Sequence, residues 1–368
     1  MRLRWSVFVL ALAVGALPAV AQAAHGKQGA PLTVYAGPNV ASPPAGIKQA
    51  DALTFFPSQV TIRVGQTVTW QFRGFHTVTF AGTMKNPPFI VAQPGSPQPT
   101  VNDAAGRPFW WSGTAPQLLL DPFALLPQGG GTLSSPATVA SSGLLRVITA
   151  PAKTAPKPYS LRFTRPGIYH YVCLVHPGMR GTVRVLGKRA KPATPAAIAK
   201  LANAQLENVV GDLRQLATTK PAQPLSVSVG AGARSGAEIT SFFPEQLTVH
   251  VGDTVTFVQN DPTDIHTVTF GPESYTLPIE QNLFQQLGSP PQPFFNPLAA
   301  LPSEPPPPSP VSYDGTNHGN GFVTSGVLDP PGSPKGPGQF VVTFTKAGTY
   351  RYECVIHPDM DGTIVVQQ

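Results

Sequence analysis

The chain is 368 residues long, which indicates two or three domains of ordinary size. Charged residues make up 12% of it and hydrophobic residues 41%, which argues against a disordered chain, a coiled coil or a polybasic nucleic-acid-binding protein. With 44 prolines and 35 glycines, turns should be abundant and long helices scarce, so we expect an all-β fold.

An export signal is predicted over residues 1–23. Two arginines precede an apolar run at 5–16, and the small-residue sequence Ala21-Gln22-Ala23 follows. This order is typical of a secretory signal that is cleaved after Ala23. An uncleaved membrane anchor is the alternative, but the run is shorter than the ~20 residues that a span needs. We therefore expect a soluble mature protein without a transmembrane span, located in the periplasm, at the cell surface or outside the cell.

The remaining sequence contains two copies of one pattern. The segment 55–70 recurs with changes as 242–257, and the pentapeptide 76–80 recurs unchanged as 266–270. Matching order and content predict an internal duplication. The predicted divisions are a signal peptide at 1–23, a first repeat at 24–187, a helical connector at 188–224 and a second repeat at 225–368.

Short β-strands are predicted within each repeat, because apolar residues alternate with polar ones at the period of a half-buried strand. Strands of this kind, separated by Gly and Pro turns, typically pack as an antiparallel sandwich. The alternating positions are Val60, Ile62, Val64, Val68, Trp70, Phe72, Leu161, Phe163, Tyr169, Tyr171, Val183 and Val185, with Leu247, Val249 and Val251 in the second repeat.

One helix is predicted, in the connector. Thr194 can serve as its N-cap, and Pro195 is favourable at its first position. Pro221 is expected to end it. Apolar residues at roughly helical spacing predict a face that docks on one or both repeats, with a free linker as the alternative. These residues are Ile198, Leu201, Leu206, Val209, Leu213 and Leu216.

Both cysteines lie in the same motif, C-x-x-H-P-x-M, near the end of each repeat. A disulfide is the usual expectation for two cysteines in an exported protein, but it gives no reason for His and Met at matching positions on both sides. With one earlier histidine, each repeat offers two imidazoles, a thiolate and a thioether, the ligand set of a blue-copper electron-transfer site. The candidate ligands are His76, Cys173, His176 and Met179 in the first repeat and His266, Cys354, His357 and Met360 in the second.

With these residues both repeats resemble cupredoxins, the plastocyanin- and azurin-type family of Greek-key sandwiches that each hold one type 1 copper. The short ligand loop is similar to that of amicyanin-like members. The resemblance implies two copper ions cycling between Cu(I) and Cu(II), and single-electron transfer between redox proteins. It covers both ends of each repeat but not the middle, where Pro- and Gly-rich insertions at about 82–140 and 271–335 separate His from Cys by 97 and 88 residues.

The insertions and the loops before the first histidines depart from that family pattern. Long loops inside a compact domain are often functional, and Trp110 and Trp111 in the first insertion either form a docking patch or anchor it to the sandwich. Asn260 resembles the family asparagine that braces the cysteine loop, whereas the first repeat is three residues shorter before His76. Three other histidines have no expected metal role: His170 and His250, on solvent-facing surfaces, and His318, with no partner apparent in the sequence.

We expect a carrier and not an enzyme. Oxidases and nitrite reductases with cupredoxin folds have further copper-binding histidines, typically one directly beside the cysteine. Neither Cys173 nor Cys354 has a histidine neighbour, and the chain contains no H-x-H pair. Without a metal that has an open coordination position, no substrate can bind and react at copper. Alternative functions are extracytoplasmic copper storage or delivery, and a part in a copper oxidase system.

The two repeats differ in charge. The net charge is +10 over 24–187, +4 over 188–224 and −9 over 225–368. Because opposite charges steer association, we expect an acidic partner or anionic surface for the first repeat and a basic partner for the second, and no nucleic acid. Drift in surface composition is the alternative. Arg180 in the first ligand loop, against Asp359 and Asp361 in the second, predicts the higher reduction potential in the first repeat and electron flow from the second to the first.

Overall fold

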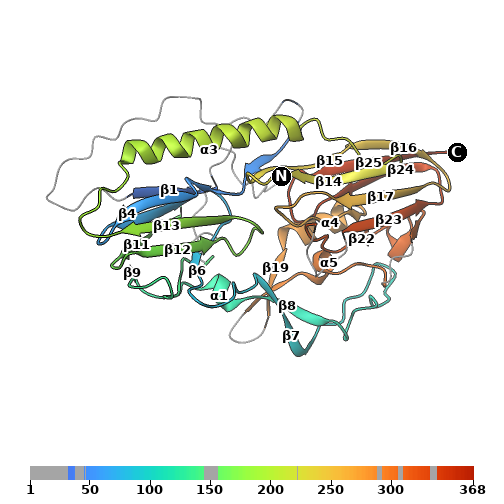
Figure 1. The fold of residues 1–368 in the computed structure, drawn as a ribbon. Helices are drawn as coiled ribbons and strands as arrows, with labels where there is room; N and C mark the ends of the chain where they lie inside the picture. The colour runs from blue at the N-terminus through green and yellow to red at the C-terminus, as the bar shows by residue number, and fades with distance from the viewer. Residues whose placement is uncertain are drawn as a thin grey trace, which may run out of the picture.

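The protein is described by a computed structural model at residues 32–37, 45, 47–144, 156–221, 223–287, 292–305, 310–331 and 338–368. The predicted signal segment 1–23 lies outside these residues. The fold consists of two β-sandwiches, which are connected by a long helix on one side and by a small sheet on the other (Figure 1). Over the described ranges no helix has the length and apolar character needed to cross a membrane.

The first sandwich is built from two five-stranded sheets, with strand orders β3-β1-β5-β11-β9 and β10-β6-β12-β13-β4. Trp70, Phe80, Phe163 and Tyr171 fill the space between them. The alternating residues predicted as strands lie in or next to β4, β5, β11, β12 and β13, which confirms the prediction. The bounds are β1 (Leu32–Ala36), β3 (Phe55–Phe56), β4 (Gln59–Arg63), β5 (Thr67–Phe72), β6 (Thr79–Phe80), β9 (Thr132–Leu133), β10 (Ala140–Ser141), β11 (Tyr159–Phe163), β12 (Gly167–Val172) and β13 (Arg180–Leu186).

The second sandwich also has two sheets. Their strand orders include β15-β14-β17-β23-β21 and β16-β25-β24-β18-β22. These orders correspond strand for strand to those of the first sandwich. The predicted all-β class, with two sandwiches joined by a helical connector, is confirmed. The bounds are β14 (Ser226–Gly232), β15 (Ala237–Phe243), β16 (Gln246–His250), β17 (Thr254–Gln259), β18 (Thr269–Phe270), β21 (Val311–Tyr313), β22 (Val323–Thr324), β23 (Gln339–Phe344), β24 (Gly348–Glu353) and β25 (Asp361–Gln367).

A strand from the N-terminal part of the chain belongs to the second sandwich. β2 (Ala50–Ala52) pairs antiparallel with β15, so that Ala52 lies opposite Ala237. It forms the edge of a six-stranded sheet, although the chain then continues directly into β3 of the first sandwich. The two sandwiches are therefore connected by backbone hydrogen bonds as well as by the connector.

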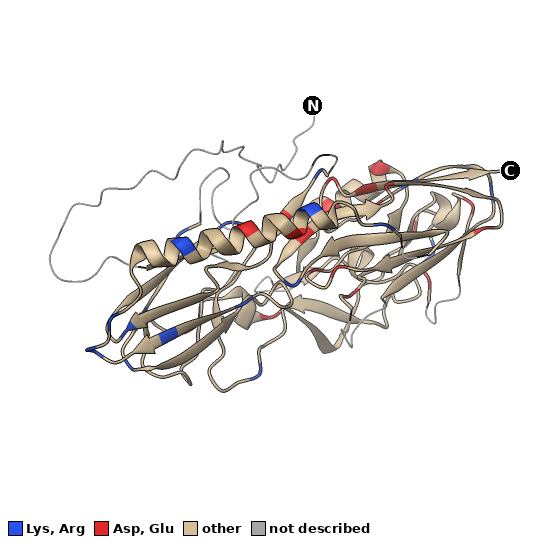
Figure 2. Cartoon of the chain, turned by 45° about the horizontal axis from the view of Figure 1, so that its top comes forward, with Lys and Arg blue, Asp and Glu red and all other residues tan. Residues whose placement is uncertain are grey.

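The predicted connector helix is α3 (Pro195–Leu216), which lies along both sandwiches (Figure 2). The Thr194 hydroxyl accepts a hydrogen bond from the Ala197 N–H at 3.2 Å, and Pro195 occupies the first turn, as expected. Ile198 packs in the core of the first sandwich, whereas Val209 and Leu213 pack against β2 and β15. The prediction that Leu201 lies on the docking face is wrong, because this side chain is 55% exposed.

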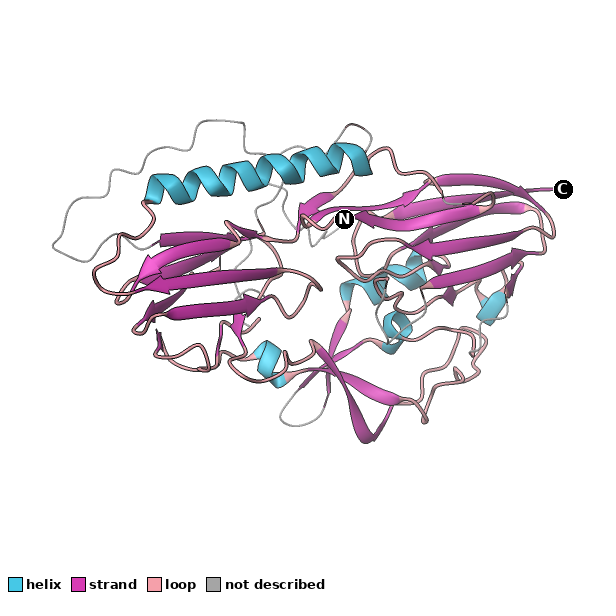
Figure 3. Cartoon of the chain, viewed as in Figure 1, coloured by secondary structure: helices cyan, strands magenta, loops and turns pink. Residues whose placement is uncertain are grey.

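The two insertions form one shared structure. β7 (Ile90–Pro97) and β8 (Pro116–Leu120) of the first insertion and β19 (Phe284–Leu287) and β20 (Gln292–Phe295) of the second make a four-stranded sheet, in which Phe294 lies opposite Leu119 (Figure 3). The insertions are thus not isolated loops but a second connection between the sandwiches. Their short helices are α1 (Pro122–Leu125), α4 (Glu273–Gln281), α5 (Pro297–Ala300) and η1 (Asn317–Gly319).

Aromatic residues anchor the first insertion, but to the second sandwich instead of its own. Trp111 is fully buried and stacks on Phe109 at 5.2 Å, in a cluster that includes Phe322 and Val355. Trp110 is 41% exposed, and its indole N–H donates to the Pro302 carbonyl at 3.0 Å. The anchoring interpretation therefore holds for Trp111.

His318 also connects the insertions, through partners that are not apparent in the sequence. Its Nδ1 lies 3.0 Å from an Asp103 carboxylate oxygen of the first insertion, and its Nε2 lies 2.9 Å from Glu304. Its partners are 215 and 14 residues away in the sequence, so no local pattern could indicate the contact. His170 and His250 are exposed, as predicted.

Candidate metal centres

The candidate ligands lie where β-strands end. In the first sandwich His76 lies between β5 and β6, and Cys173 directly follows β12. β6 pairs with β12, and Thr79 lies opposite Val172. This pairing brings the early histidine to the loop that carries the other three candidates. In the second sandwich, the pairing of β18 with β24 brings His266 to the loop that begins with Cys354.

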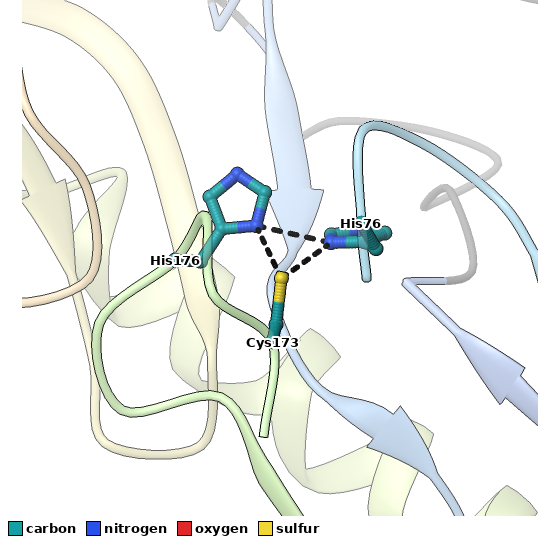
Figure 4. A group of neighbouring side chains, drawn as sticks. All are labelled: His76, Cys173 and His176. Carbon is teal, nitrogen blue, oxygen red and sulfur yellow. Dashed lines mark hydrogen bonds between the residues drawn. The ribbon is translucent and has the colours of Figure 1, made fainter. Parts of the chain in front are cut away.

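The first group, which we name the Cys173 site, contains His76, Cys173 and His176 (Figure 4). The two Nδ1 atoms are 3.0 Å apart, and they lie 4.0 and 3.7 Å from the cysteine Sγ. All three side chains are buried and point toward one another. Three potential metal ligands therefore surround one point inside the protein.

The second group, the Cys354 site, has the same geometry. The Nδ1 atoms of His266 and His357 are 3.1 Å apart and lie 4.0 and 3.6 Å from the Cys354 Sγ. His357 is the one partly exposed member of the group. Both cysteines are unpaired, so the structure contains no disulfide between them.

Hydrogen bonds within each ligand loop place the methionine next to the cysteine. The Cys173 N–H donates to the Met179 carbonyl at 2.9 Å, and the Cys354 N–H donates to the Met360 carbonyl at 3.0 Å. Both methionines are buried in the same hydrophobic clusters as the cysteines. Each loop thus supplies Cys, His and Met to one small region.

A threonine after the early histidine braces each cysteine loop. The Thr77 hydroxyl accepts from the Leu174 N–H at 2.8 Å, and the Thr77 N–H donates to the Cys173 Sγ at 3.4 Å. Thr267 makes the equivalent contacts at 2.9 and 3.4 Å. The expectation that Asn260 has this role is wrong, because its amide donates to the Ser228 hydroxyl instead.

A glycine with positive φ faces the early histidine in each site. At Gly37 (φ 65°) an added Cβ would overlap the His76 Nε2, and at Gly230 (φ 66°) it would overlap the His266 Nε2. Sequence reasoning missed both residues. Gly37 follows Ala36 and Gly230 follows Val229, and glycines are too common in this chain for either to stand out alone. Only an alignment of the two repeats would show that they occupy the same position.

The cysteines are poised to be thiolates. Burial alone would raise the pKa of Cys173, but hydrogen bonds and positive charge from His176 and His76 hold this pKa well below the usual range. Burial also tends to raise the pKa of Cys354, but hydrogen bonds and positive charge from His266 and His357 hold it well below the usual range. A thiolate is the form of cysteine that binds metals.

Carboxylates lie next to the outer nitrogens of His176, His266 and His357, and sequence reasoning missed them as well. The His266 Nε2 lies 3.4 Å from Asp261 and 4.0 Å from Glu238, both fully buried. The Nε2 atoms of His357 and His176 lie 3.2 and 3.6 Å from one oxygen of Asp264. Such outer contacts orient ligand imidazoles and tune a bound metal.

The donor set fits copper. Thiolate and thioether ligands favour Cu(I), imidazole suits both oxidation states, and two histidines, one cysteine and a methionine together match a blue-copper site. The loops are closed by hydrogen bonds and buried, which holds these side chains close together. The His76, Cys173 and His176 group and its His266, Cys354 and His357 counterpart could each hold one ion.

No protein-family model matches the chain, and no curated protein matches it in sequence. Among solved structures, an oxidised amicyanin mutant is 22% identical with a TM-score of 0.21, covering 39% of this chain and 81% of that one. Oxidised plastocyanin from Dryopteris crassirhizoma is 20% identical, also with a TM-score of 0.21, covering 39% of this chain and 99% of that one. The chain is thus similar to these proteins over about two fifths of its length.

Proposed function

We propose that this protein is an exported electron-transfer protein that binds one type 1 copper ion in each sandwich. The Cys173 site would take Met179 as its fourth ligand, and the Cys354 site would take Met360. The observation that carries the proposal is the convergence of two imidazole Nδ1 atoms on a buried cysteine Sγ, found in both sandwiches. Bound copper would supply a one-electron Cu(I)/Cu(II) couple.

Burial and bracing of the ligands support a carrier. A type 1 site transfers electrons quickly when its ligands keep their positions in both oxidation states, and a buried, hydrogen-bonded loop restricts their movement. His76, Cys173 and Met179 are all buried, and Thr77 holds the start of the ligand loop. A storage or delivery protein would instead benefit from exposed, exchangeable ligands, so this alternative has less support.

The other histidines give no support for an enzyme. In the described part of the chain, His170 and His250 are exposed, and His318 is held by Asp103 and Glu304. None of them joins a candidate copper group with a cysteine. We propose electron transfer without catalysis at both sites. Export and a location in the periplasm or at the cell surface remain part of the proposal, on the strength of the predicted signal segment.

Charge supports different partners for the two sandwiches. Figure 2 shows basic residues predominating on the sandwich that contains β4 and β13, and acidic residues gathering toward the other. A groove of about 830 Å³ lies beside the first ligand loop, where Arg180 of the first sandwich and Arg234 of the second both line it. We assign this basic groove to an acidic redox partner, and a basic partner to the second sandwich.

Copper loading tests the proposal. Full-length protein is titrated with Cu(II), copper is counted per chain, and visible absorption is recorded for wild type, Cys173→Ser and Cys354→Ser. We expect two coppers and an intense thiolate-to-copper band in the wild type, and about half of that band in each variant. A colourless protein with labile copper would favour storage or delivery, and equal retention of zinc would contradict the proposal.

A further inference from the structure

The two candidate centres face each other across one carboxylate. One Asp264 oxygen lies 3.6 Å from the His176 Nε2 of the Cys173 site and 3.2 Å from the His357 Nε2 of the Cys354 site. The separation of the two Nε2 atoms therefore cannot exceed the sum of these distances. Asp264 and His176 are both buried, so this contact lies inside the molecule.

We propose that the two centres exchange electrons within a single chain, along a path from His357 through Asp264 to His176. The inference rests on the proposed function, because it requires copper at both sites. In each transfer one electron leaves a reduced centre and reaches an oxidised one. No bond forms or breaks and no proton moves, so the step needs no further reactant.

The loop that carries Asp264 is longer than its counterpart in the first repeat. Between Trp70 and His76 the first repeat has five residues, whereas the second has eight between Phe257 and His266. The longer loop contains Asp261 and Asp264. The additional length in the second repeat thus supplies the side chain that contacts both centres.

The outer nitrogens of both histidines face carboxylates. Asp51, in β2, also interacts electrostatically with His76 and His176 of the Cys173 site and with Asp264. Glu238 lies buried on the neighbouring strand β15. Its carboxylate, the Asp264 carboxylate and a His357 ring nitrogen lie within 4.8 Å of one another. The Nε2 edge of His176 therefore faces the carboxylate that also contacts the other centre.

Several contacts fix the distance between the centres. β2 hydrogen-bonds to β15, and the Gln49 side chain just before β2 donates to the Pro358 carbonyl in the second ligand loop. The same Gln49 side chain accepts from the Thr240 hydroxyl at 2.9 Å. Helix α3 and the shared sheet of β8 and β20 connect the sandwiches elsewhere. Such links favour one separation of the centres in every molecule.

Two measurements on copper-loaded full-length protein test this inference. Pulse radiolysis delivers less than one electron per chain, and the redistribution between centres is followed with spectra assigned from Cys173→Ala and Cys354→Ala. Pulsed electron paramagnetic resonance of the fully oxidised protein measures the magnetic coupling between the two Cu(II) ions. We expect redistribution at a first-order rate that does not depend on protein concentration, together with a strong dipolar coupling.

Variants identify the path. We expect Asp264→Ala to slow the redistribution by about tenfold or more, because it removes the contact shared by His176 and His357, and the copper content of each site is counted in the same sample. Asp264→Asn keeps a hydrogen-bonding group and should be slowed less. Asp253→Asn is the matched control, because it makes the same charge change in the turn at the opposite end of β17 and should leave the rate unchanged.

The outcomes separate this inference from the proposed function. Two intact blue bands with a redistribution rate proportional to protein concentration, or without dipolar coupling, would overturn the inference alone. Absence of the blue bands in the wild type would overturn the proposed function and the inference with it. A third copper per chain that is lost in Asp264→Ala would assign the carboxylates to another metal and would also overturn the inference.

Discussion

The outer nitrogens of the two early histidines have different surroundings. The His266 Nε2 faces Asp261, whereas the His76 Nε2 has no hydrogen-bond partner among the described residues. An anion beside a copper ligand stabilises Cu(II), the more positively charged state. Asp261 therefore supports a lower reduction potential at the Cys354 site, and electron flow toward the Cys173 site.

Substitution of Asp261 tests this difference. Asp261→Asn removes the charge at similar volume, and we expect it to raise the potential of the Cys354 site by on the order of 60 mV, equivalent to a tenfold shift of a one-electron equilibrium. Spectroelectrochemical titration measures both potentials in one sample. A larger shift at the Cys173 site, or a lower potential in the wild type there, would contradict the assigned direction.

Gly37 tests how closely the Cys173 site is packed. Gly37→Ala would place a methyl group on the His76 imidazole and should weaken copper binding at this site by tenfold or more, leaving the Cys354 site unchanged. Gly95→Ala is the control, because Gly95 also has a positive φ (75°) but an added Cβ there would contact nothing within 4 Å. Competition with a copper chelator measures the affinities. Equal losses in both variants would show that backbone strain, and not the clash, weakens binding.

At the scale of elements, helix α3 stabilises the contact between the sandwiches through a few buried side chains. Leu213 is 1% exposed beside β2 and β15, whereas Leu201 is 55% exposed on the same helix. Leu213→Ala should lower the free energy of unfolding by about 2–5 kcal/mol. Leu201→Ala should change it by less than about 0.5 kcal/mol. Urea denaturation of the metal-free protein compares the two, and similar losses would contradict the docked position of the helix.

The strands and the ligand set could be predicted because their signals are local. Alternation at Val68, Trp70 and Phe72 reports the burial of one face of β5, and the spacing of Cys173, His176 and Met179 is that of one short loop. The pairing of β2 with β15 and of β8 with β20 joins segments far apart in the sequence, without a periodic signal of its own. These pairings, and with them the role of Asp264, required the three-dimensional structure.

At the scale of the whole molecule, the insertions connect the sandwiches through a titratable contact. Hydrogen bonds to Glu304 and Asp103 raise the pKa of His318, although its partial burial opposes this shift. Since the folded-state pKa is above the unfolded value, the stabilisation is complete below about pH 6.5 and is lost as the pH rises through the raised pKa.

This gives a pH-dependent difference between the wild type and His318→Gln. We expect the wild type to be more stable than the variant at about pH 6 and the difference to shrink toward pH 9. Taking the difference between the two proteins removes the titration of groups that they share. Chemical denaturation at several pH values measures it, and a difference that grows with pH would contradict the contact between the insertions.

The pair of copper centres is the claim on which the rest of the account depends. A crystal structure of the protein loaded with Cu(II), with anomalous diffraction recorded at the copper absorption edge, tests it most directly. We predict two anomalous peaks per chain, one among His76, Cys173 and His176 and one among His266, Cys354 and His357, with Asp264 between them. Copper bound elsewhere, or a single peak among the carboxylates, would contradict the account.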